Sequence, residues 1–214
     1  MQKEYALILA WPATKCKQAG AWYDGLMHYL GFSKNGYYKV GHAGIVLINQ
    51  LGEPHYFDFG RYHAPYGNGR VRDKHTDYDL ELKTRIEKNE EGNLNIEKLI
   101  EELQYKKACH GDGVLEVSLV EIDFNKAFCK AKTMQNRGFI PYGPFVRKGT
   151  NCSRFVQVVA SKGMRFGIRK ILLNLPLMLT PTPMWNVLIG KRLKNKKKNL
   201  LYVKNIKKET QIVT

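Results

Sequence analysis

The sequence predicts an α+β protein in which helices pack on an antiparallel sheet. Short apolar strands recur along the chain, and amphipathic helices fall between them without the βαβ rhythm of a parallel sheet. The clearest element is a hairpin, in which VGHAGIVLI at 40–48 and HYFDF at 55–59 are joined through the four-residue turn NQLG. Strands joined by so short a connection run antiparallel, which sets the expected character of the whole sheet.

The other elements are bounded by capping, glycine and turn residues. Apolar periodicity sets their type, and Asn, Asp and Gly mark where they begin and end. In chain order we expect a buried strand at 5–11, a helix at 17–30, a Gly-rich aromatic loop at 60–73, a helix with an Asn cap at 95–107, a strand at 114–122, a helix at 125–136 and a helix that begins at Cys152.

The cysteines neither pair nor suggest a metal site. Cys16, Cys109, Cys129 and Cys152 form no CxxC motif and have no zinc-ligand spacing with histidine. We therefore expect free thiols, no metal and no cofactor. Because free thiols suit a reducing compartment, and the apolar run near the N-terminus is interpreted as a strand, the expected location is the cytoplasm.

Cys152 lies where a polar turn becomes an apolar helix, in GTNCSRFVQVVAS at 149–161. Thr150 and Asn151 are good N-cap residues, and Cys152 shares one helix face with Phe155, Val156 and Val159. The sulfur is either a small buried hydrophobic group or a nucleophile, because a helix N-terminus stabilises a thiolate.

A nucleophilic cysteine needs a base and a group that orients the base. His42 opens the strand HAGIVLI after Gly41, where its side chain can reach a helix end. On the next strand His55 shares a face with two phenylalanines, whereas Tyr56 and Asp58 lie on the other face. A carboxylate between Phe57 and Phe59 suits an acceptor that holds an imidazole in one tautomer.

GHAGIVLINQLGEPHYFDF, followed about a hundred residues later by NCSRFV, resembles the circularly permuted papain-like branch of the NlpC superfamily. Lecithin:retinol acyltransferase-like proteins and bacterial cysteine hydrolases belong to that branch. The resemblance spans about residues 37–160 and implies a papain-like fold, with Cys152 as nucleophile and His42 as base. It leaves either Asp58 or His55 as the third catalytic residue. Because these two lie on opposite faces of their strand, only one can face His42, and we expect it to be Asp58.

The expected reaction is acyl transfer from an amide, ester or thioester, by hydrolysis or by exchange with another acceptor. The resemblance allows a peptide or an acyl lipid as substrate. Aromatic residues flank the expected site, and we expect them to line a substrate cleft: Tyr37, Tyr38, Tyr62 and Tyr142. The alternative is a non-catalytic binding module that keeps the fold and holds an anionic partner with a basic tail.

The catalytic domain is expected to span 1–170, followed by an apolar strap and a basic tail at 171–214. Residues 171–190 carry no charge and contain three prolines, which argue against a membrane-spanning helix and favour an extended strap over the core. An interfacial membrane anchor is the alternative for this strap.

The net charge is +16, and residues 191–214 contribute +8 through nine Lys or Arg and one Glu. We interpret this tail as a solvated chain, with an anionic membrane surface as the alternative partner that would make the protein peripheral to a membrane. The absence of an RNP, helix-turn-helix or zinc-finger pattern argues against nucleic acid.

Overall fold

The computed structural model describes residues 3–18, 20, 22–29, 31, 33–38, 40–87, 94–146, 148–175 and 181–193. Within these residues the core is a seven-stranded antiparallel sheet in the order β10-β8-β1-β5-β6-β7-β9. Its strands are β1 (Glu4–Trp11), β5 (His42–Ile48), β6 (Pro54–Gly60), β7 (Asn68–Arg72), β8 (Glu116–Ile122), β9 (Ile140–Pro141) and β10 (Lys191–Leu193). A small second sheet contains β2 (Cys16–Lys17), β4 (Tyr37–Tyr38) and β3 (Ser33–Lys34).

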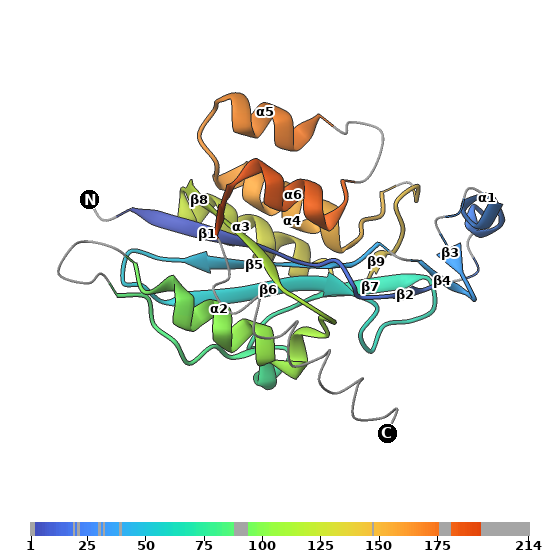
Figure 1. Cartoon of the computed structure of the whole chain (residues 1–214), viewed down its shortest axis with the longest axis horizontal. Coiled ribbons are helices and arrows are strands. Elements are labelled where there is room, and N and C mark those ends of the chain that lie inside the picture. Colours follow the sequence, from blue (N-terminus) through green and yellow to red (C-terminus); the bar gives the residue numbers. More distant parts are fainter. Residues whose placement is uncertain are drawn as a thin grey trace, which may run out of the picture.

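Helices cover both faces of the large sheet (Figure 1). One face carries α3, α4 and α6, with α5 outside them, and the other face carries α2. The helical elements are α1 (Asp24–Tyr29), α2 (Ile96–Tyr105), α3 (Phe124–Gln135), α4 (Cys152–Gly163), α5 (Ile168–Asn174), α6 (Pro183–Ile189) and the 3₁₀ turns η1 (Tyr78–Leu80) and η2 (Lys107–Cys109). The predicted α+β class is confirmed.

The position of β1 in the middle of the sheet explains why its sequence is apolar without alternation. Ala6, Ile8 and Ala10 pack in the core under α3 and α4, whereas Leu7 and Leu9 pack in the core under α2. A strand covered on both faces has no solvent side, so every position favours an apolar residue.

The strand register brings His42 and Asp58 to one face of the sheet. In the β5–β6 ladder Gly44 is opposite Asp58, and in the β1–β5 ladder His42 is opposite Trp11. Residues two apart on a strand point the same way, so His42 and Gly44 share their face with Asp58.

Two of the predicted assignments in the first half of the chain were wrong. The segment 17–30 is not one helix, because Cys16–Lys17 is a strand and α1 covers only Asp24–Tyr29. Gly20 has a φ of +69°, which an α-helix does not accommodate. The segment 60–73 is not only a loop, because β7 lies within it and pairs with β6.

The segment 171–190 is not an extended strap in the residues described there. It contains the end of α5 and the whole of α6, and Leu173 and Val187 are fully buried in the core. Pro183 occupies the first turn of α6, where a missing N–H costs nothing, and the Thr182 side chain accepts a hydrogen bond from the Trp185 N–H at 3.1 Å.

The start of the basic tail is also ordered, because β10 pairs with β8 at the edge of the sheet. Residues 194–214, which carry most of the tail's charge, lie outside the described residues. In the part of the chain that the structure describes, no helix is both long enough and apolar enough to cross a membrane.

Candidate active site

Cys152 is the first residue of α4, and Asn151 caps the helix. The Asn151 Oδ1 atom accepts a hydrogen bond from the Arg154 N–H at 2.9 Å, with Asn151 itself in an extended conformation. The expected face of Phe155, Val156 and Val159 is fully buried, and Cys152 is only 5% exposed. The cap therefore fixes the point at which the helix starts and holds the sulfur at its N-terminus.

His42 is placed by a glycine turn and an aromatic neighbour. Gly41 has a φ of +77°, and a Cβ atom there would lie 2.8 Å from the Trp11 carbonyl oxygen, so no other residue fits this turn without strain. The imidazole stacks on the Trp11 ring with centroids 5.8 Å apart. The side chain is 5% exposed and lines a cavity.

The His42 ring joins the other two predicted residues. Its Nε2 atom lies 3.3 Å from Asp58 Oδ2, and Cys152 is close enough to the ring to raise its pKa. Cys152, His42 and Asp58 thus meet although 110 residues separate the first two in sequence.

The environment of His42 favours its protonated form. Burial lowers the pKa of the imidazole, but hydrogen bonds with Asp58 and Cys152 and the negative charge of these partners outweigh it and raise the pKa to about 9. At neutral pH the ring is therefore predominantly an imidazolium.

Asp58 is completely buried and accepts hydrogen bonds from three side chains. Arg72 donates through Nε to Oδ1 at 3.0 Å and through Nη2 to Oδ2 at 2.6 Å, and the Tyr56 hydroxyl donates to Oδ2 at 3.1 Å. Burial raises the pKa of this carboxyl, but the bonds with His42 and Arg72 outweigh it, and the net pKa is lowered. Asp58 is therefore a fixed carboxylate facing the imidazolium.

Arg72 was not predicted as part of the site. It is 3% exposed, its guanidinium carbon lies 3.4 Å from the centroid of the Tyr62 ring, and Nη2 also donates to the Ala108 carbonyl at 3.1 Å. The alternating RVR at 70–72 was the available sign of a strand that would point Arg70 and Arg72 to one face. It was missed because Gly and Asn surround it.

The structure does not bring His55 to the site. His55 packs against Phe124 and Phe128 on the α3 side, and the centroid of each phenylalanine ring lies 5.4 Å from the centroid of the imidazole. Of the two candidates for the third position, Asp58 is the one in contact with His42.

The four tyrosines separate into two pairs. Tyr62 and Tyr142 line the cavity next to His42. Tyr37 and Tyr38 form β4 in the small sheet and are not among the lining residues; Tyr38 donates its hydroxyl to the Asp24 carboxylate, and Tyr37 is 41% exposed. Substrate contact by any of them stays a prediction.

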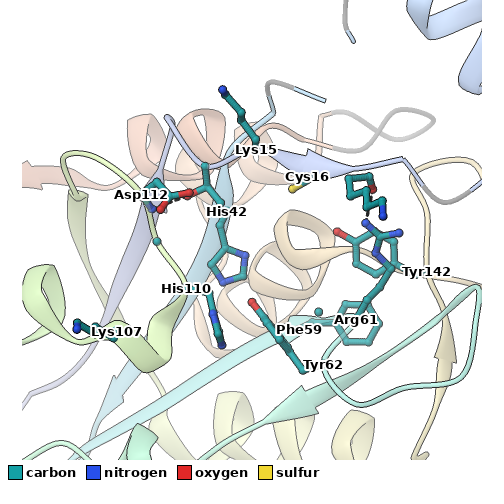
Figure 2. Close-up of a pocket in the computed structure, with 14 residues that line it drawn as sticks. Lys15, Cys16, His42, Phe59, Arg61, Tyr62, Lys107, His110, Asp112 and Tyr142 are labelled. Carbon is teal, nitrogen blue, oxygen red and sulfur yellow. Dashed lines mark hydrogen bonds between the residues drawn. The ribbon is translucent and has the colours of Figure 1, made fainter. Parts of the chain in front are cut away.

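The cavity beside His42 has a volume of about 480 Å³ (Figure 2). Its wall holds several basic and aromatic side chains together with the thiol of Cys16, which donates to the Gly41 carbonyl at 3.5 Å. Burial, and next the charge of Cys152, raise the pKa of Cys16 to about 12, so Cys16 is a neutral thiol close to Cys152. Within the described ranges, no group of three His, Cys, Asp or Glu side chains is placed to hold a metal ion.

An antiparallel sheet covered by helices, with a cysteine at a helix start and a histidine at a strand start, is consistent with the papain-like α+β class. A family model described as "Type VI secretion system effector TseH-like" matches residues 6–166. The chain therefore belongs to the TseH-like family of type VI secretion system effectors, which is consistent with the papain-like fold and suggests a hydrolase-type effector. Searches of curated proteins and of solved structures gave no match.

Proposed function

We propose that the protein is a cysteine hydrolase that cleaves an amide, ester or thioester bond, with Cys152 as nucleophile, His42 as base and Asp58 as the residue that positions His42. The observation that carries the proposal is the position of His42, whose Nε2 lies 3.3 Å from the buried carboxylate of Asp58 and whose pKa is raised by both Asp58 and Cys152. A hydrolase-type effector family agrees with it.

The first step forms a thioester with the enzyme. The reaction starts from the pair in which the proton is already on His42, which the raised pKa of the imidazole favours. The Cys152 thiolate attacks the carbonyl carbon, so an S–C bond forms and the carbonyl oxygen becomes an oxyanion. The Cys152 N–H is a suitable donor to that oxyanion, because N–H groups in the first turn of a helix have no intrahelical acceptor. When the bond to the leaving group breaks, His42 returns the proton to it.

The second step releases the acyl group. His42 takes a proton from water, the hydroxide adds to the thioester carbon, and the C–S bond breaks to give a carboxylic acid and Cys152. Asp58 holds the ring through Nε2 in both steps, and its negative charge stabilises the imidazolium each time that it forms. An alternative acceptor in place of water would give acyl transfer from the same intermediate.

The experiment is turnover of p-nitrophenyl acetate at neutral pH, with a test for a burst of p-nitrophenol equal to the enzyme concentration. We expect Cys152→Ala to abolish both burst and turnover, and His42→Ala to lower turnover at least a hundredfold. Cys129→Ser, at an exposed thiol on α3, is the matched control and should retain activity. Equal rates for wild type and Cys152→Ala would refute the proposal and favour a binding module.

A further inference from the structure

One side of the cavity carries an arginine with which no carboxylate of the described residues forms an ion pair. Arg61 lines the cavity and is half-buried. Its Nη2 atom donates to the Lys17 carbonyl, and its guanidinium carbon lies 5.2 Å from the centroid of the Tyr142 ring. These two contacts hold the guanidinium in place, but neither supplies a negative charge.

The other charged groups of the wall are mostly basic. Lys15, Lys17 and Lys107 are exposed at the cavity, and among the described residues none of them, nor Arg61, forms an ion pair. Asp112 is the acidic member of the wall, but Figure 2 shows it across the cavity from Arg61. The described residues of the wall therefore leave the charge of Arg61 available to an anionic ligand.

Arg61 and Cys152 both act on the same two groups of the cavity wall, Cys16 and Tyr142. Burial raises the pKa of Cys16 and of Tyr142, Cys152 raises both further, and Arg61 lowers both. In Figure 2 Arg61 and Tyr142 lie on one side of the cavity, and His42 and His110 lie on the other. A substrate whose carboxylate is bound by Arg61 would therefore extend across the cavity toward His42.

We propose that Arg61 determines specificity by binding a carboxylate of the substrate close to the scissile carbonyl, so that the cavity selects acyl substrates of the acidic-peptide type. This inference rests on the proposed function. A guanidinium binds a carboxylate through two parallel N–H donors, and the lysines at the rim add attraction without fixed geometry. Of the five N–H donors of Arg61, the Lys17 carbonyl engages only Nη2.

The test compares alkylation of Cys152 by iodoacetate and by iodoacetamide. In each reaction the sulfur forms an S–C bond as the C–I bond breaks and iodide leaves, and the reagents differ only in carrying a carboxylate or a neutral amide. The rate at Cys152 is followed by mass spectrometry of the peptide that contains it, which separates it from Cys16 and Cys129. The measured quantity is the ratio of the two rates.

The His42 imidazolium also attracts an anion, so the ratio in the wild-type protein does not by itself test Arg61. The change in the ratio when Arg61 is substituted provides the test. We expect Arg61→Gln to lower the iodoacetate to iodoacetamide ratio about tenfold by slowing iodoacetate alone. Arg61→Lys keeps the charge without the planar fork, and its ratio should fall between those of the wild type and Arg61→Gln.

Arg137→Gln is the matched control, since it removes the same charge from an exposed arginine just beyond α3 and should leave the ratio unchanged. An unchanged ratio in both Arg61 variants, while Cys152 still reacts with both reagents, would overturn the inference and leave the proposed function standing. If neither reagent labels Cys152 in the wild-type protein, the proposed function fails, and this inference fails with it.

Discussion

Replacing Asp58 by asparagine should both destabilise the protein and change the titration of His42. The substitution preserves shape but removes the charge that faces Arg72, which is almost fully buried. It also converts one acceptor oxygen, which now accepts from Arg72, Tyr56 or His42, into an NH₂ donor that faces donors. The substitution therefore affects the fold through Arg72 as well as the site through His42.

The size of the effect follows from burial. Removing one partner of a buried ion pair costs about 3–5 kcal/mol, because the other charge stays buried and unpaired. Arg72 keeps the Ala108 carbonyl and the Tyr62 ring, so we expect the low end, about 3 kcal/mol. Arg70 and Asp77 form a similar two-bond pair at 2.7 Å with side chains 18% and 15% exposed, and Asp77→Asn should cost about 1 kcal/mol.

The assay is urea unfolding of both variants beside the wild type, with the midpoint compared at constant slope. The second readout is the pH dependence of p-nitrophenyl acetate turnover. Protonated His42 returns the proton to the leaving group, so turnover should fall as the pH rises through the His42 pKa of about 9. Without the Asp58 charge, this alkaline limb of the pH profile should move down by about one pH unit.

The result that would refute this reasoning is equal destabilisation by Asp58→Asn and Asp77→Asn together with an unmoved alkaline limb. In that case Asp58 would neither neutralise Arg72 nor orient His42. If Asp58→Asn were as stable as the wild type but its alkaline limb moved, Asp58 would position His42 without being needed to neutralise Arg72.

Four further predictions test how the site is held and what the tail does. Gly41→Ala should cost at least 1 kcal/mol in urea unfolding, because the positive φ and the Trp11 carbonyl both oppose a Cβ, and it should slow Cys152 alkylation. Asn151→Ala should cost about 1 kcal/mol and lower Cys152 reactivity, whereas Asp123→Ala, which removes the cap of α3, should destabilise similarly and leave reactivity unchanged. The stability supplied by charged His42 is fully present below its unfolded pKa of about 6.5 and is lost as pH rises through about 9, so the urea midpoint should fall over that window in the wild type and less in His42→Gln. Deletion of 194–214, which leaves β10 intact, should remove any salt-sensitive binding to anionic vesicles without changing p-nitrophenyl acetate turnover; unchanged binding would place the contact elsewhere.

The parts of the fold that local rules determine could be predicted from the sequence. The continuous apolar run of β1, the hairpin of β5 and β6, and the capped start of α4 each depend on residues close together in the chain. The shared face of His42 and Asp58 needed only the hairpin, whose ladder pairs Gly44 with Asp58.

The remaining parts depend on contacts that no local pattern encodes. Arg72 reaches Asp58 from a strand of five residues rich in Gly, Asn and Arg, whose pairing with β6 decides its conformation. Cys16 and Arg61 join the cavity from a two-residue strand and from the residue after β6. The prolines of 171–190 suggested an extended chain because the sequence does not show where a short helix begins. Pro183 in fact lies at the start of α6, where proline is favoured.

The site can form at only one end of the sheet. Cys152 belongs to the core under α4, whereas His42 stacks on Trp11, which belongs to the core on the opposite face. A helix on one face and a histidine on the other can meet only where the strands end. That is where Trp11 closes β1, His42 opens β5 and α4 starts. A one-residue shift in the β5 register would turn His42 to the other face and away from Asp58. The glycine turn before His42 and the asparagine cap before Cys152 therefore matter to reactivity as much as the three reacting and positioning side chains, because they fix both elements at the residue where the sheet ends.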